Sequence, residues 1–92
     1  MPVTRINHFR ARKSTVEQLH SFMESMCEKV KEMPGCRSVH LLRSTENPAH
    51  LAIVEEWESV EAHQRAASTI PPEDMKTAQS LFARPPVGEY YQ

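Results

Sequence analysis

The stretch Leu51–Ser59, Leu-Ala-Ile-Val-Glu-Glu-Trp-Glu-Ser, decides the fold that we predict for this chain. It begins with four consecutive apolar residues and ends in a charged segment that holds the only tryptophan, Trp57. A short apolar run rich in β-branched residues is typical of a strand that is buried on both faces. Because 92 residues offer little material to cover two faces of a sheet, the stretch predicts a central strand with a second copy of the chain over one face.

A long amphipathic helix is the clearest element before this strand. Ser14 and Glu17 have the Ser-x-x-Glu spacing of a capping box, which would satisfy free amide groups at a helix start. Pro34 and Gly35 end the helix, since proline cannot continue it and glycine accepts a left-handed turn. Between them, apolar residues recur at helical spacing and predict a core-facing stripe: Val16, Leu19, Phe22, Met23, Met26, Val30 and Met33.

The remaining patterns complete a β-α-β-β-α-β order. Strands are expected over 3–11, 36–44, the Leu51 stretch and 87–91, and the second helical region is broken into 60–68 and a helix that starts at Pro71-Pro72. This order is that of a ferredoxin-like α+β fold, an antiparallel sheet with its helices on one face. We expect one domain over residues 1–92 and a two-fold homodimer through the other sheet face.

Composition argues against several classes of function. The formal net charge is −1 and the basic residues form no block, so a nucleic-acid partner is not expected. No apolar run approaches the roughly 20 residues that cross a membrane, and no signal-peptide core is present, so we expect a cytoplasmic protein. Two cysteines outside a Cys-x-x-Cys pair, and five histidines without ligand spacing, predict no metal site.

Three short motifs are similar to those of a known family: Met33-Pro34-Gly35-Cys36, Leu42-Arg43-Ser44, and Glu55–Ser59 leading into Ala62. In order and spacing the chain resembles the antibiotic biosynthesis monooxygenase (ABM) domain, a dimeric α/β-barrel with a ferredoxin-like protomer. The resemblance implies a small, aromatic or polycyclic substrate between sheet and helices, and in several members oxygen chemistry without metal or flavin.

We therefore expect a monooxygenase that acts on a small aromatic or quinone-like compound without a cofactor. The alternative is a non-catalytic dimer that binds small molecules or serves as a scaffold. Haem binding and degradation is a third interpretation, because the haem-degrading branch of the family also places an asparagine in the first strand, where this chain has Asn7.

The expected catalytic residues are Asn7 and His63. Family members often carry a histidine nine residues after the tryptophan, and this chain has Ala66 there. His63 lies about one helical turn earlier on a similar face, where it would replace that histidine as a general base. The amide of Asn7 would orient a substrate carbonyl or stabilise an oxyanion. The structural alternatives are a hydrogen bond to a loop for Asn7 and a solvated position for His63.

Five further residues are expected to bind substrate, among them the tryptophan, whose simplest role is packing with its indole N–H bonded to an acceptor. Glu55 and Glu56 alternate across the sheet, so one carboxylate must face a buried side, and we expect it to bond an arginine or a backbone amide. The expected substrate-binding residues are Phe9, His40, Trp57, Ala66 and Phe82.

Overall fold

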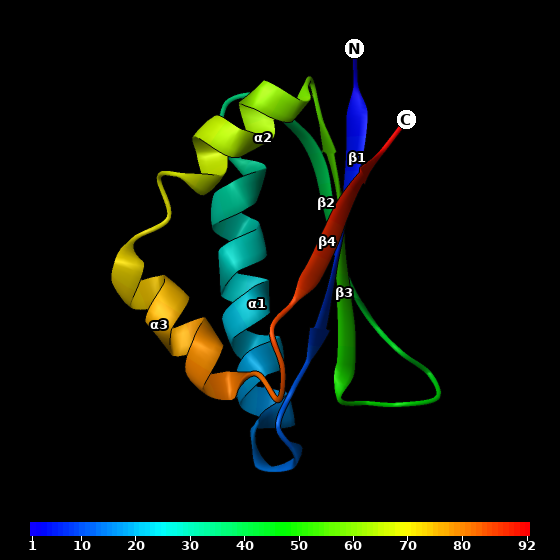
Figure 1. The fold of residues 1–92 in the computed structure, drawn as a ribbon, viewed down its shortest axis with the longest axis vertical. Coiled ribbons are helices and arrows are strands. Elements are labelled where there is room, and N and C mark those ends of the chain that lie inside the picture. Colours follow the sequence, from blue (N-terminus) through cyan, green and yellow to red (C-terminus); the bar gives the residue numbers. More distant parts are fainter.

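In the computed structural model, which describes residues 1–92, a four-stranded antiparallel sheet carries three helices on one face (Figure 1). The strand order is β2-β3-β1-β4, so β3 is a central strand as predicted. The ferredoxin-like order is also confirmed. The elements are β1 (Val3–Arg10), α1 (Val16–Lys31), β2 (Cys36–Arg43), β3 (His50–Trp57), α2 (Val60–Ala67), α3 (Pro72–Leu81) and β4 (Val87–Tyr91), with a 3-10 turn at Lys13–Thr15.

The start of α1 differs from the predicted capping box. Ser14 lies inside the 3-10 turn, so its hydroxyl is not at the position that caps the helix. Thr15 holds the N-cap position, and its hydroxyl donates hydrogen bonds to the carbonyls of Arg12 and Leu81 instead of accepting one from the helix. The bond to Leu81, 2.9 Å long, ties the start of α1 to the end of α3.

The other helix boundaries follow the sequence patterns. Gly35 has φ +88°, the left-handed conformation that favours glycine after a helix. The Ser59 hydroxyl accepts a 3.0 Å hydrogen bond from the Ala62 amide and so caps α2. The chain breaks at Ile70-Pro71, and α3 begins at Pro72 with acidic residues in its first turn.

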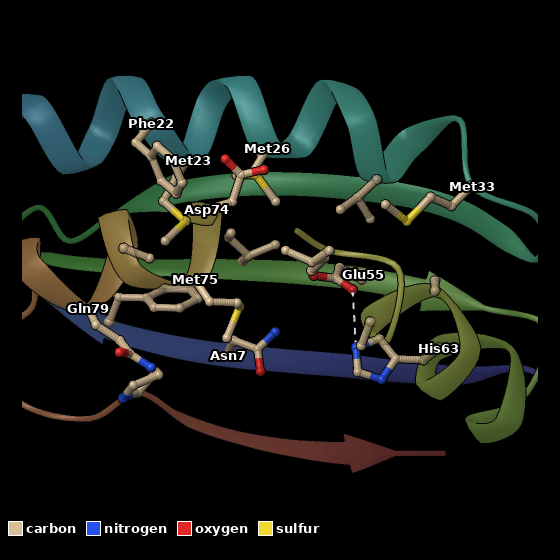
Figure 2. A pocket seen from close by; sticks show the side chains of 18 of the residues that line it. Asn7, Phe22, Met23, Met26, Met33, Glu55, His63, Asp74, Met75 and Gln79 are labelled. Carbon is tan, nitrogen blue, oxygen red and sulfur yellow. Dashed lines mark ion pairs between the residues drawn. The ribbon is translucent and has the colours of Figure 1, made fainter. Parts of the chain in front are cut away.

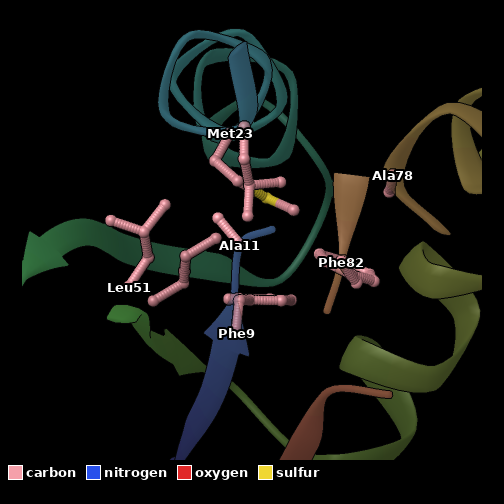
Figure 3. Packing of buried hydrophobic residues seen from close by; sticks show 8 residues of the cluster. Phe9, Ala11, Met23, Leu51, Ala78 and Phe82 are labelled. Carbon is pink, nitrogen blue, oxygen red and sulfur yellow. The ribbon is translucent and has the colours of Figure 1, made fainter. Parts of the chain in front are cut away.

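The core lies between the sheet and the helices, where alternate residues of β1 and β3 meet α1 and α3. Phe9 pairs with Leu51 across the two strands, and the Phe9 ring stacks on Phe82 with 5.5 Å between ring centroids (Figure 3). Leu19 of α1 and Leu51 of β3 are fully buried. This packing fixes the height of α1 and α3 above the sheet.

The opposite face of the sheet carries no helix (Figure 1). Ile6, Ala52 and Val54 lie at its centre and are partly exposed, and Leu42 beside them is 52% exposed. We refer to these four residues as the open apolar face. No helix of the protein is both long enough and apolar enough to span a bilayer.

Candidate functional site

A cavity of about 210 Å³ lies between α1 and the sheet, with α2 and α3 at its sides (Figure 2). Its walls are mainly apolar because the core-facing stripe of α1 meets the core-facing residues of β1 and β3. Met26, Met33 and Met75 line the cavity beyond the tightly packed core, so the methionines do more than fill the core. Flexible, polarisable thioethers suit the faces of an aromatic ligand.

The polar end of the cavity is formed by Asn7, Glu55 and His63, from β1, β3 and α2 respectively (Figure 2). Asn7 and Glu55 share the helix-facing side of the sheet through strand alternation, since Asn7 pairs with Ile53 and Arg5 pairs with Glu55. His63 lies on the helix side of the sheet, because Ser59 caps α2 directly after β3 and so begins the helix that carries His63. Asn7, Glu55 and His63 thus place three polar side chains in a mainly apolar cavity, and Asp74 and Gln79 of α3 line it elsewhere (Figure 2).

Glu55 is the only buried charged residue, with 7% of its surface exposed. Its Oε1 atom accepts a 2.7 Å hydrogen bond from the indole N–H of Trp57, which is itself 1% exposed. Burial raises the pKa of the Glu55 carboxyl, while the Trp57 hydrogen bond and the charge of Arg5 act in the opposite direction. One of the two adjacent glutamates faces inward as predicted, but its partner is an indole and not an arginine or a backbone amide.

His63 lies between two partners. Its Nδ1 atom is 2.6 Å from the hydroxyl oxygen of Tyr90, and its Nε2 atom is 3.9 Å from Oε1 of Glu55. In the tautomer with the proton on Nδ1, His63 donates to the Tyr90 hydroxyl oxygen, and the lone pair of Nε2 on the Glu55 side stays free to accept a proton. Burial, with a smaller effect of the Arg5 charge, lowers the pKa of His63 and favours the neutral imidazole that a base requires.

Asn7 is oriented by its neighbour Arg5. The Nε atom of Arg5 donates a 3.0 Å hydrogen bond to Oδ1 of Asn7, and the Arg5 guanidinium lies 4.6 Å from the centre of the Tyr90 ring. Gly88 of β4 faces both side chains, and a Cβ atom there would overlap with Oδ1 of Asn7. The Nδ2 group of Asn7 makes no hydrogen bond within the protein and points into the cavity (Figure 2).

The structure brings six of the seven expected site residues together. Asn7 and His63 both line the cavity, and so do the four expected substrate-binding residues named at the end of this paragraph. His40 lies apart from them: it is exposed on the other side of β2, since Val39 and Leu41 occupy the positions that face the core. The four are Phe9, Trp57, Ala66 and Phe82.

Three residues of the polar network were not among the expected site residues. Glu55 could be found from strand alternation, which places it on the same face as Trp57. Arg5 shares that face with Asn7 by the same alternation, whereas Tyr90 could not be found, because its contacts depend on the register between β4 and β1, in which Tyr90 pairs with Arg5. Local sequence patterns do not show how β4 pairs with β1.

Neither cysteine offers a nucleophile to the cavity. Cys27 and Cys36 are both free thiols and neither lines the cavity. Burial, together with nearby carboxylates headed by Glu55, raises the pKa of Cys27 to about 11. The thiol of Cys27 is therefore protonated at neutral pH.

Solved structures of similar shape come from distant organisms. The Rv0793 protein of Mycobacterium tuberculosis has a TM-score of 0.87 at 22% identity, with 100% of this chain and 94% of that chain covered. A conserved protein of Methanosarcina mazei Go1 has a TM-score of 0.90 at 15% identity, with 100% and 92% covered. SnoaB, described as a cofactor-independent oxygenase from Streptomyces nogalater, has a TM-score of 0.83 at 17% identity, with 99% and 91% covered.

At these identities the likeness establishes the fold alone. No curated protein matches the sequence significantly. The sequence does match a family model, "Antibiotic biosynthesis monooxygenase", over residues 2–81, which takes in every element from β1 to α3. The chain therefore belongs to the antibiotic biosynthesis monooxygenase family.

Proposed function

We propose that the protein is a cofactor-independent monooxygenase that oxidises a small aromatic or quinone-like compound held in the cavity. Family membership supports this proposal, and so does the description of SnoaB as a cofactor-independent oxygenase. The observation that carries it is the polar end of the cavity. There an unpaired donor, Nδ2 of Asn7, lines the same cavity as the carboxylate of Glu55 and the neutral imidazole of His63.

Oxygenation without a cofactor requires a substrate that supplies the electrons. In the proposed reaction His63 accepts a proton from a phenolic ring compound, with Glu55 stabilising the imidazolium that forms. Asn7 donates a hydrogen bond to the resulting oxyanion. The electron-rich anion of a quinol then reduces O2 at a ring CH beside the oxyanion. That CH becomes C–OH, the two ring hydroxyls become quinone carbonyls, and the second oxygen atom leaves as water with two of the quinol's hydrogens, so no external reductant is needed.

Oxygen uptake tests this proposal. We expect consumption above the buffer rate with at least one member of a panel of quinols and polyphenols. Asn7→Ala should lower the rate by about 100-fold, the usual effect of losing one oxyanion donor. Asn7→Asp is the matched control for the Arg5 contact, because it keeps the acceptor for Arg5 but removes the donor. Background rates with the whole panel would overturn the proposal.

The second candidate function is non-catalytic binding of a small molecule by a dimeric protein. The observation that favours it is Ala66 at the position where the family often has histidine, with His63 one turn away. The two functions differ in turnover. A clear rate that Asn7→Ala abolishes while the fold is retained would exclude the binding function.

A homodimer through the open apolar face is part of the proposal. Two copies packed through Ile6, Ala52, Val54 and Leu42 would remove these side chains from water in a two-fold arrangement. Light scattering at micromolar concentration should give twice the mass of one chain, and Val54→Lys should give the monomer. A monomeric wild-type protein would contradict this assembly.

A further inference from the structure

We infer that the cavity selects a neutral ring compound of one ring with two oxygen substituents, at least one of them a hydroxyl, and that it rejects the carboxylated analogue of the same ring. This inference rests on the proposed function only for the location of the site. It concerns which ligands bind in the cavity, and binding can be measured even if the protein catalyses no reaction.

The size of the cavity limits the ligand. A dry protein cavity of about 150 Å³ binds benzene, and pockets for drug-sized ligands occupy about 300–1,000 Å³. The cavity here, at about 210 Å³, lies just above the first value and below the second range. It therefore holds one ring with short substituents, and a fused second or third ring would extend beyond its walls.

The charges around the cavity exclude an anionic ligand. Glu55, Asp74 and His63 are the ionisable residues that line it, and no lysine or arginine does so. Arg5 is committed to Asn7 and the Tyr90 ring. Lys29, whose side chain is 61% exposed, lies 3.7 Å from Asp74. A carboxylate on the ligand would therefore enter an apolar space near Glu55 without a counterion.

The polar groups select the substituents of the ring. Asn7 and Glu55 are diagonal neighbours on two paired strands, a relationship that places their Cβ atoms about 7 Å apart. Nδ2 of Asn7 donates, whereas the Glu55 carboxylate accepts. A ligand that satisfies both presents an oxygen acceptor to Asn7 and a hydroxyl to Glu55, and its ring then lies among the methionines.

Anaerobic binding of a matched pair of ligands tests the inference. Hydroquinone and 2,5-dihydroxybenzoate share one ring and both hydroxyls, and only the second carries a carboxylate. Calorimetry or NMR titration at about pH 8 should show weaker binding of the benzoate by on the order of 100-fold, as expected for a like charge about 6 Å away at an effective dielectric of about 20. A three-ring dihydroxy compound should bind more weakly than hydroquinone.

Glu55→Gln should reduce this discrimination to roughly tenfold or less, because it removes the charge and keeps the shape. Glu58→Gln is the control, since Glu58 is exposed and does not line the cavity. Equal binding of the two wild-type ligands, stronger binding of the three-ring compound, or no binding of hydroquinone would each overturn the inference. Failure of oxygen uptake with selective binding intact would count against the proposed function alone.

Discussion

Nδ1 of His63 lies 2.6 Å from the hydroxyl oxygen of Tyr90, so the imidazole of α2 is held by the last strand of the sheet. The rings of His63 and Tyr90 meet edge to face with 5.3 Å between centroids, and Trp57 packs against His63 at the same separation. His63 is thus fixed in orientation from two sides, with its other nitrogen toward Glu55.

Tyr90→Phe tests the orienting role of this contact. The substitution removes one hydrogen bond and keeps the ring that lies under Arg5. We expect kcat to fall roughly fivefold, the equivalent of about 1 kcal/mol for one hydrogen bond, with KM unchanged. Tyr91→Phe is the control, since the Tyr91 hydroxyl bonds Glu89 and does not contact His63. Equal kcat values for wild type and Tyr90→Phe would contradict this role.

The pH dependence of kcat/KM follows from the two pKa directions. Burial lowers the pKa of His63 below its ordinary value of 6.5 and raises that of Glu55 above its ordinary value of 4.5. Since His63 must be deprotonated to accept a proton, the rate should fall on acidification through its lowered pKa, with an acid limb below pH 6.5. A wild-type acid limb above pH 6.5 would contradict this assignment.

Glu55→Gln should stabilise the fold while it lowers activity. The folded-state pKa of Glu55 is raised, so ionising this buried carboxyl costs more in the folded chain than in the unfolded chain. That cost is fully present above the folded-state pKa and absent below the ordinary value of 4.5. Glutamine avoids the cost and keeps an acceptor for the Trp57 indole.

Urea unfolding at two pH values measures this effect. The midpoint of Glu55→Gln should exceed that of wild type at about pH 7.5, and the two should converge near pH 4. Turnover should fall by about 100-fold in the same variant, within the range for a group that assists general base catalysis. A variant that is less stable than wild type at neutral pH would show that the Glu55 carboxylate contributes net stability.

Gly88→Ala tests how tightly β4 supports Asn7. A methyl group at this position overlaps with Oδ1 of Asn7 and with the Arg5 guanidinium. We expect a loss of about 1–3 kcal/mol in the free energy of unfolding, as for other overpacked sites. The loss should shrink when Asn7 and Arg5 are both replaced by alanine, which a double-mutant cycle measures. An equal loss in both backgrounds would locate the strain elsewhere.

Much of the fold could be predicted because the spacing of apolar residues along the sequence distinguishes helices from strands. The apolar stripe of α1, the stop at Pro34-Gly35 and the run at Leu51 each indicate one element, and their order leaves one common architecture. The capping box failed because Ser-x-x-Glu spacing does not specify which residue ends the preceding turn. Here Thr15, and not Ser14, precedes the first residue of α1.

The part of the candidate site that lies on the strands could be predicted, because alternation along a strand tells which side chains share a face. Asn7, Phe9 and Trp57 share a face by parity, and His40 lies on the opposite side of its strand from Val39 and Leu41 by the same rule. The position of Tyr90 depends on the pairing of β4 with β1, which joins it to Arg5 across the whole chain and leaves no local signal.

Oxygen uptake by a variant with a filled cavity tests the central claim most directly. Ala66→Phe places an aromatic ring in the cavity wall, and Gln64→Phe places the same ring at an exposed position on the same helix. With a quinol or polyphenol that the wild type oxidises, we expect uptake to fall to the buffer rate in Ala66→Phe and to persist in Gln64→Phe, with circular dichroism spectra unchanged. Undiminished uptake by a folded Ala66→Phe variant would contradict catalysis in this cavity.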